Sequence, residues 1–502
     1  MAGSLSSRFT KPAFAIWCLT GAIVLIVRIL APSDLGQNLD QSKTIAFTLD
    51  MVHNNQWILP RDSLGELTRK PPMVNWLGAP IVALGFHSEL ALKLPAVISG
   101  ISISILIFFA ARFFFRKLDT DIADKADKSI AAHATPLALL ASAAWLASPS
   151  AVKHIYFMRP DILFTALLVI AWFASVLLLT NQQLKEPKRL ALLIWLFTAA
   201  AILTKGPLAI LIPLYLILHI LIITPKPDRK PAFARTCWQW GIPLMLLIPA
   251  AWLFAAYRIN PDHVTNTLFA KELGSRLGRG GPSGILAAAL ANPGYFFERF
   301  LPWCLPAALA ILFKPSRNLR THPMGPAILW VLLVLATTTL AAMDAGSYIM
   351  PAYPAAAILA IYALFRILVS SQATRINPAF ITIAALILIF ASLITAREAT
   401  MSRAARTNTG QHIKAFASVA SQHIQSNSVR FHQMGDLPIA SLMGKHQPGD
   451  IAPDPSHRWL IQPTHIDTVA TPVLVSEPIV THDPDTGEPI DTTIQIGLYQ
   501  LP

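Results

Sequence analysis

Charged side chains stand where several apolar segments of this sequence begin or end. Carboxylates of this kind can accept or orient a proton, and ammonium or guanidinium groups can bind an anion such as phosphate. They form one site only if the apolar segments place them on the same side of a membrane. The residues concerned are Asp40, Lys70, Arg159, Asp161, Lys205, Glu272 and Asp344.

The stretch Asp40–Pro72 is the longest clearly polar segment among the first 110 residues. Ile45 and Leu49 share one helical face, which predicts an amphipathic helix along a membrane surface. Asp40 can serve there as an ordinary N-cap, and Lys70, just before two prolines, as an interfacial anchor. An acid and a cation in one outer segment also fit a reactive site at the bilayer surface.

Two later segment ends carry charges as well. Arg159 and Asp161 flank Pro160 at the start of an apolar run, where a charge is costly and indicates function, although an aspartate can also cap a helix. Lys205 lies in a Thr-Lys-Gly-Pro turn between two apolar runs with no acid nearby in sequence. Its anion is a protein carboxylate, a lipid phosphate or a substrate phosphate, and the pattern favours a phosphate.

The loop 258–293 contains the stretch KELGSRLGRGGPSG. Its glycines and basic residues indicate a mobile flap with affinity for anions, or a simple flexible connector. Glu272 is then either an acid of the site or a surface residue. The histidines of residues 397–502 lack the spacing of a metal site, so no metal site is predicted there. No cofactor is predicted elsewhere in the chain, and a divalent metal stays open without support from a motif.

The composition indicates a polytopic membrane protein. The 502 residues are 54% hydrophobic and only 13% charged, against roughly 25% charged in soluble domains. The net charge of +13 is explained by Lys- and Arg-rich cytoplasmic loops, so nucleic-acid binding is not predicted.

Apolar runs of about 20 residues predict about 11 transmembrane helices, with about 13 as the upper bound. The loop charges orient them so that the Lys and Arg clusters lie inside and the seven residues above lie outside. The short apolar run 73–86 is expected to be re-entrant or interfacial. The spans are expected at about 12–32, 88–113, 134–150, 161–180, 190–204, 207–224, 238–257, 294–313, 324–342, 347–368 and 377–396.

These runs divide the chain into two predicted parts. Residues 1–396 form a transmembrane domain with a juxtamembrane loop, 33–87, and the outer loop 258–293. Residues 397–502 are polar and contain no span. Their alternating strand patterns and one amphipathic helix predict a small α/β domain on the outer face. The predicted fold class is an all-α polytopic membrane protein with this C-terminal domain.

The motifs together resemble the GT-C membrane glycosyltransferases. The resemblance is closest to the branch of bacterial lipid A 4-amino-4-deoxy-L-arabinose transferases and protein O-mannosyltransferases, and it covers roughly residues 10–396. The first outer loop of that branch carries an Asp-Glu pair, a helix, a Trp-x-x-Pro element and Lys-Pro-Pro. The matching elements here are Asp40-Gln41, Trp57-Ile58-Leu59-Pro60, Lys70-Pro71-Pro72, Arg159-Pro160-Asp161, the Thr-Lys-Gly turn at 204–206 and the Tyr-Ile-x-Pro element at 348–351.

The resemblance implies an inverting hexosyl or pentosyl transferase. Its donor would be a polyprenyl-phosphate sugar, and its acceptor lipid A or lipopolysaccharide, another envelope glycan or a protein. It would act at the periplasmic face of the bacterial inner membrane, in contact with membrane lipids. The implied roles are catalytic for Asp40 and Asp161, phosphate-binding for Lys70, Lys205 and Arg159, and accessory for Glu272 and Tyr348.

This chain departs from the family at three places. Gln41 replaces the usual Glu, and Arg69 occupies the position where the arabinose transferases carry a Glu implicated in a metal site. No metal is therefore carried over from the family. Asp344-Ala345-Gly346 replaces the usual Lys-containing approach to the Tyr-Ile-x-Pro element. Two other functions stay open. A lipid-linked-sugar flippase or other transporter would pair polar residues at mid-span, and a non-catalytic membrane scaffold would act through the C-terminal tail.

Overall fold

The computed structural model places most of the chain. It describes residues 2–30, 39–62, 65–119, 125–273, 281–312, 320, 322–343, 346–370, 383, 386–396, 409–424, 429–431, 459–463, 472–476, 479–482 and 489–500.

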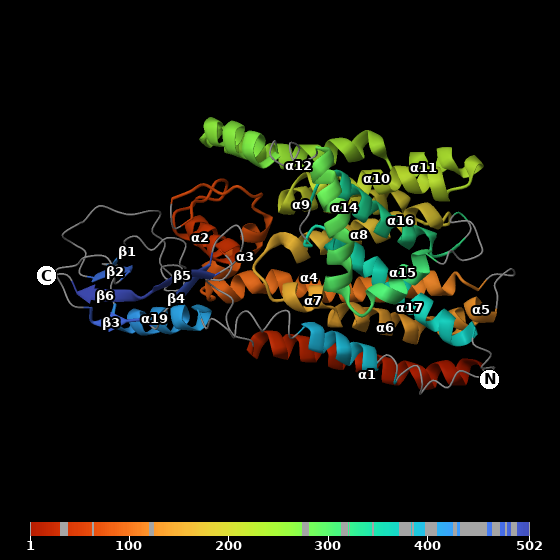
Figure 1. Cartoon of the computed structure of the whole chain (residues 1–502). Helices are drawn as coiled ribbons and strands as arrows, with labels where there is room; N and C mark the ends of the chain where they lie inside the picture. Colours follow the sequence, from red (N-terminus) through yellow and green to blue (C-terminus); the bar gives the residue numbers. More distant parts are fainter. Residues whose placement is uncertain are drawn as a thin grey trace.

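Helices form the body of the molecule, and the longest of them run side by side (Figure 1). Those of 14 residues or more are α1 (Ala2–Leu30), α2 (Leu39–His53), α4 (Ser88–Arg116), α6 (Ala134–Ala147), α8 (Pro160–Thr180), α9 (Pro187–Lys205), α12 (Trp238–Ile259), α14 (Pro282–Phe300), α16 (Gly325–Leu340) and α17 (Tyr353–Ser370). The shorter ones are α3 (Met73–Ala83), α5 (Lys125–Ala132), α7 (Pro149–His154), η1 (Pro207–Ile210), α10 (Leu211–Leu218), η2 (His219–Ile223), η3 (Lys226–Asp228), α11 (Arg229–Arg235), η4 (His263–Leu273), α15 (Cys304–Leu312) and η5 (Met350–Ala352).

Six helices in the described part of the chain are long and apolar enough to cross a membrane, and seven if α5 and α6, bent by 85°, form one span. Four shorter apolar helices occupy Met73–Ala83, Pro207–Ile223, Gly325–Leu340 and Leu386–Ala396. The predicted spans one to seven, nine and ten each overlap one of these helices. Of the eleventh, residues 386–396 are helical, and most of 377–385 lies outside the described residues. The predicted all-α polytopic fold is confirmed.

The eighth span was expected to be continuous over about 294–313, and this is wrong. Helix α14 ends at Phe300, and α15 begins only at Cys304. Pro302 lies in the break and has no N–H group to donate into a helix, which explains the interruption. The predicted outer loop 258–293 is also largely helical, because η4 and the start of α14 occupy it.

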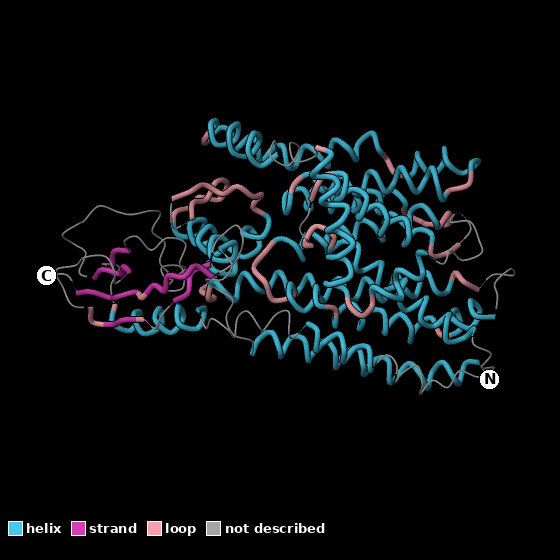
Figure 2. Tube along the Cα trace, viewed as in Figure 1, coloured by secondary structure: helices cyan, strands magenta, loops and turns pink. Residues whose placement is uncertain are grey.

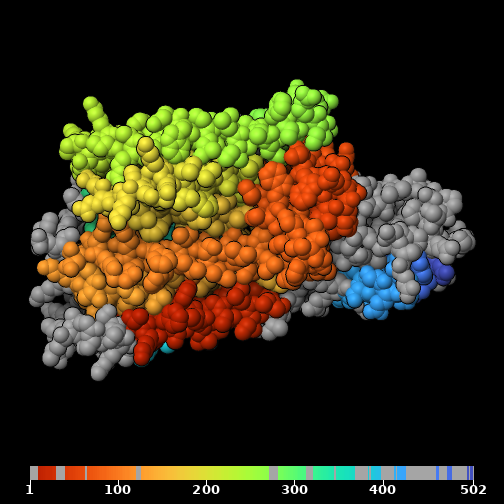
Figure 3. Space-filling view, turned by 180° about the vertical axis from the view of Figure 1, so that it is seen from behind, coloured from red at the N-terminus to blue at the C-terminus, as the bar shows by residue number. Residues whose placement is uncertain are grey.

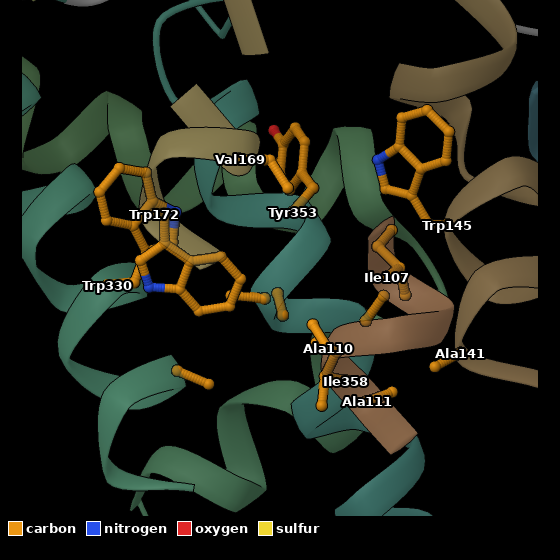
Figure 4. Close-up of a cluster of buried hydrophobic side chains, with 14 of the residues drawn as sticks. Ile107, Ala110, Ala111, Ala141, Trp145, Val169, Trp172, Trp330, Tyr353 and Ile358 are labelled. Atoms are coloured by element: carbon orange, nitrogen blue, oxygen red, sulfur yellow. The ribbon is translucent and has the colours of Figure 1, made fainter. Parts of the chain in front are cut away.

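Helix α8 lies at the centre of the bundle, since 89% of its most apolar window is buried. Its Trp172 stacks on Trp330 of α16, with ring centroids 5.8 Å apart, and Figure 4 shows the two rings side by side. Trp330 also donates a hydrogen bond from its indole N–H to the Pro351 carbonyl. These contacts fix the start of α17 against α8 and α16.

Helices α2 and α3 cover one end of the bundle. The apolar face that was predicted for α2 is buried, with Ile45 and Leu49 against Val74 of α3, Leu92 of α4 and Met158. The C-terminal strands lie at this same end, and the N-terminus lies at the other (Figures 1 and 2). In the view from behind, the surface of α2 and α3 again lies next to the C-terminal part (Figure 3).

The C-terminal region contains the predicted helix and strands. Helix α19 (Thr409–His423) packs its Ile413 and Phe416 on the sheet residues Ile461 and Leu498. One sheet has the strand order β1-β2-β6-β3 and a second pairs β4 with β5. The strands are β1 (Val429–Phe431), β2 (Trp459–Pro463), β3 (Leu474–Val475), β4 (Ile479–His482), β5 (Pro489–Ile494) and β6 (Ile496–Gln500). Strands β1 and β2 are parallel, and the other pairs are antiparallel.

Candidate active site

The start of α8 holds one acid and one cation in fixed positions. Arg159 is the N-cap residue in an extended conformation, and Pro160 occupies the first helical turn, where its missing N–H costs nothing. Asp161 follows in the same turn and is fully buried. Its carboxylate is held by cations: Lys205 Nζ lies 2.5 Å from Oδ1, and Arg159 Nε lies 3.2 Å from Oδ2. The Arg159 contact is an ion pair without hydrogen-bond geometry.

Lys205 is the last residue of α9, 44 positions after Asp161. The helix stops there because Gly206 adopts a φ of +83°, a conformation that favours glycine. The sequence pattern favoured a phosphate as the anion of Lys205, whereas the structure gives it the carboxylate of Asp161. A buried ammonium requires such a partner when no other anion is bound.

Asp40 lies in the first turn of α2 and meets two cations. Its Oδ1 accepts a 2.7 Å hydrogen bond from Lys70 Nζ, and its Oδ2 lies 3.3 Å from Arg159. Lys70 is positioned by the Thr68 hydroxyl, which bonds both the N–H and the carbonyl of Lys70, and by the two prolines that delay the start of α3. Neither residue acts only as a cap or as an interfacial anchor.

The five side chains therefore form one row of alternating charge, in the order Lys70, Asp40, Arg159, Asp161 and Lys205. The row runs inward from the surface: the exposed fraction of the side chain is 48% for Lys70, 26% for Arg159 and 0% for Asp161. Three cations and two acids give the row a net charge of +1. The site can therefore accept one further anion with little electrostatic cost.

The cations determine the ionisation of Asp40. Partial burial acts to raise the pKa of its carboxyl, but Lys70 and Arg159 together outweigh burial and hold that pKa below its ordinary value. Asp40 is thus a carboxylate at neutral pH. It is also a weak base for as long as both cations contact it.

The turn before η5 closes the buried end of the row. Tyr348 places its ring 4.2 Å from Lys205 Nζ. The carbonyl and hydroxyl of Ser347 each lie 3.5 Å from the same ammonium. Tyr348 was predicted as an accessory residue, whereas Ser347, the residue before the Tyr-Ile-x-Pro element, had no predicted role.

Two buried residues beside the row carried no role in the sequence prediction. The side-chain carbonyl of Gln41 accepts a 3.1 Å hydrogen bond from the Met158 N–H, while its amide nitrogen has no partner. His154 in α7 is buried near Asp161, and its Nδ1 bonds the Ser150 carbonyl. Burial lowers the pKa of His154 to about 3, so the ring is neutral at neutral pH. The departure at Gln41 was visible in the sequence, but its contact across 117 residues was not.

The remaining predicted residues lie outside the described site. The backbone of Glu272 belongs to η4, but its side chain falls outside the described residues, as does all of Asp344. Within the described ranges no three His, Cys, Asp or Glu side chains lie close enough to hold a metal ion. Arg69, at the family's acidic metal position, pairs with Glu66 instead.

The arrangement of helices defines the class of fold. It is the fold of the GT-C membrane glycosyltransferases, as the sequence resemblance predicted. The chain resembles the crystal structure of ArnT from Cupriavidus metallidurans bound to undecaprenyl phosphate, with a TM-score of 0.65 and 16% identity over 96% of this chain and 97% of that one. The apo form of the same ArnT gives a TM-score of 0.63 over 97% of each chain.

Two further proteins are similar to parts of the chain or of its fold. The oligosaccharyltransferase of Archaeoglobus fulgidus, in complex with Zn and sulfate, has a TM-score of 0.51 and 14% identity over 89% of this chain and 68% of that one. An uncharacterized protein of Aquifex aeolicus (strain VF5) is 23% identical over 357 residues, which are 67% of this chain and 62% of that relative's length. No family model matches the sequence.

Proposed function

We propose that this protein is a membrane glycosyltransferase that moves a sugar from a polyprenyl-phosphate donor to an acceptor at the periplasmic face of the bacterial inner membrane. The observation that carries the proposal is the charged row from Lys70 to Lys205, which lies at the ends of helices and has one cation in excess. The shared fold with ArnT, which was crystallised with undecaprenyl phosphate, supports the choice of donor.

The reaction breaks the bond between the anomeric carbon and the phosphate oxygen and forms a bond from that carbon to the acceptor oxygen. Negative charge develops on the departing phosphate, where cations stabilise the transition state. Lys70, Arg159 and Lys205 supply these cations in the proposal. Asp161 keeps Lys205 and Arg159 in place before the donor arrives.

Asp40 accepts or orients the acceptor proton. A phosphate that engages Lys70 or Arg159 takes positive charge away from Asp40 and so raises its pKa toward that of a useful base. The carboxylate is thereby activated when the donor is bound. If the acceptor is itself a phosphate that is already ionised, Asp40 positions the acceptor without removing a proton.

The location of the charges favours a transferase over a transporter. A flippase or transporter was expected to pair polar residues at mid-span. The ion pairs of the described residues instead lie in loops or within two turns of a helix end, as in Glu89–Lys93 and Asp127–Arg366. The acceptor we propose is lipid A or lipopolysaccharide, another envelope glycan, or a protein.

Comparative mass spectrometry of cells with and without the gene tests the proposal. Lipid A, envelope glycans and glycoproteins are compared, and one of them should lose the mass of one sugar when the gene is deleted. Wild-type protein and the control Asp228→Asn, on the short helix η3, should restore the sugar. Asp40→Asn should not restore it, although it reaches the membrane in normal amount. Normal transfer by Asp40→Asn would exclude Asp40 from the reaction.

A second measurement tests the donor contacts. Lys205→Ala should raise the apparent Michaelis constant for the lipid-linked sugar in a reconstituted reaction. If the apparent Michaelis constant for the donor is unchanged, Lys205 does not bind the donor phosphate. If transmembrane movement of the lipid-linked sugar is lost on gene deletion but no sugar is transferred in vitro, the protein is a transporter.

A further inference from the structure

Arg299 is a cation near the charged row and lies in the last turn of α14. Its Nε is buried and has no hydrogen-bond partner among the described residues, and its guanidinium lies 5.4 Å from the centre of the Tyr295 ring. Among the described residues no carboxylate pairs with it, and its neighbour Glu298 is exposed. An unpaired charge within a membrane bundle is costly and therefore indicates a bound anion.

The guanidinium lies against the turn that closes the charged row. A Cβ atom added to Gly346 would be 2.4 Å from Arg299 Nε and 2.8 Å from Cζ, so glycine leaves the space that the arginine fills. The next two residues after Gly346 are Ser347 and Tyr348, both in contact with Lys205. Arg299 and Lys205 thus approach the same three-residue turn.

Helix α14 also carries an apolar stripe. Leu286, Leu290 and Phe297 are exposed and fall on one side of the helix, about 180° away from Arg299 at 100° per residue. In a membrane protein such a stripe faces lipid. One helix therefore joins a lipid-facing surface to a guanidinium that lies against the same turn as Lys205, which matches a ligand with an apolar tail and an anionic head.

We propose that Arg299 binds the phosphate of the polyprenyl-phosphate donor as the lipid enters beside α14. This inference rests on the proposed function. It adds to the row a cation that pairs with no acid among the described residues, and the phosphate supplies that partner when the donor is bound. Guanidinium groups bind phosphate oxygens through directed hydrogen bonds, which favours an arginine at this position.

Binding of undecaprenyl phosphate and of undecaprenol to the full-length protein in nanodiscs tests the inference. The wild type should bind the phosphate form more tightly than the alcohol. Arg299→Ala should weaken binding of undecaprenyl phosphate roughly tenfold or more, the loss of a charge-assisted hydrogen bond. Its binding of undecaprenol should be unchanged. Arg299→Lys should retain part of the affinity.

Two other variants sharpen the result. Gly346→Ala should displace the flexible Arg299 side chain and weaken phosphate binding while leaving Arg299 in the sequence. Arg189→Gln, an exposed arginine paired with Glu186 at the start of α9, should bind as the wild type does. Melting temperatures of all variants establish that they are folded.

The outcomes separate the two proposals. A wild-type protein that does not distinguish undecaprenyl phosphate from undecaprenol would contradict the proposed donor. A wild type that does distinguish them, together with normal phosphate binding by Arg299→Ala, would overturn the role of Arg299 and leave the proposed function intact. Equal weakening for both lipids would mean that Arg299 only supports the structure.

Discussion

Asp161 in the first turn of α8 and Lys205 at the end of α9 form a buried ion pair, with exposed side-chain fractions of 0% and 11%. Two helices that meet at one end of the bundle thereby hold an acid and a base together away from water. Taking two charges out of water costs free energy that their attraction barely offsets. A buried ion pair of this kind adds little to the stability of the folded state, so its presence favours a functional role.

Single and double substitutions of this pair should separate stability from activity. Asp161→Leu leaves the buried Lys205 ammonium without its carboxylate and should lower the free energy of unfolding by about 3–5 kcal/mol. Lys205→Met should cost less, because Asp161 keeps its ion pair with Arg159. The double variant Asp161→Leu/Lys205→Met removes both charges and should recover most of that loss. Thermal or denaturant unfolding in detergent measures this. Sugar transfer should be lost in all three variants, and transfer by the double variant would show that the pair only supports the fold.

The pH dependence of transfer should reflect the contact of Asp40 with Lys70. Because the pKa of Asp40 is held below its ordinary value, its carboxylate is present above that lowered pKa and is lost only as pH falls through it. The wild-type rate should therefore show no acid limb from Asp40 above about pH 4. Lys70→Met removes the positive charge and should move the acid limb to higher pH, in addition to weakening donor use.

The rate at saturating donor, measured across pH for both proteins, checks this. Lys70→Arg serves as the control because it keeps the charge, and its acid limb should stay near that of the wild type. An acid limb that does not move in Lys70→Met would mean that Lys70 does not set the ionisation of Asp40.

His154 should make stability depend on pH below neutrality. Burial lowers its pKa to about 3, below the ordinary value of 6.5, so the unfolded chain binds a proton that the folded one rejects. The neutral ring contributes fully to the free energy of unfolding above pH 6.5, and this contribution is lost as pH falls toward 3. The slope should approach about 1.4 kcal/mol per pH unit from this one group.

Melting temperature measured between pH 5 and pH 8, about the range in which histidine changes charge, checks this prediction. His154→Gln has no titrating ring and should show a flatter pH dependence than the wild type. His87→Gln, at an exposed position before α4, is the matched control and should behave as the wild type does. Identical slopes for the wild type and His154→Gln would remove His154 as the cause.

Gln41 should fix the distance between the two acids. Its side chain accepts the N–H of Met158, one residue before Arg159, and so ties α2 to the start of α8. Gln41→Leu leaves that buried N–H unpaired, which should cost about 1–3 kcal/mol of unfolding free energy and lower the rate constant more than donor affinity. Gln41→Glu keeps the acceptor oxygen and should retain the geometry at pH values where the new carboxyl is neutral.

The positioning role of Gln41 is tested by kinetics over a range of pH. The rate constant and the donor Michaelis constant are measured for Gln41→Leu and Gln41→Glu. Recovery of Gln41→Glu at low pH is expected from a positioning role. If the rate constant falls equally in both variants and at every pH, Gln41 contributes only its packing volume and no hydrogen bond.

Hydropathy alone predicted most of the helices and placed their charged residues at helix ends. In the described part of the chain, six predicted spans match helices long and apolar enough to cross a membrane, because the bilayer sets the length of such a helix. The predicted positions of Asp40, Lys70, Arg159, Asp161 and Lys205 all fall at helix ends or in loops next to them. Hydropathy did not predict the helix break at Pro302, because it is averaged over many residues and a single proline changes the average little.

Which of these charges meet depends on how the helices pack. Asp161 and Lys205 are 44 residues apart, and Asp40 and Lys70 are 30 apart, so no local pattern fixes their pairing. The pairing follows from how α2, α3, α8 and α9 pack. The contact of Arg299 with Gly346 likewise joins two segments far apart in the sequence, because the missing side chain of the glycine leaves room for the guanidinium at the turn that also contacts Lys205.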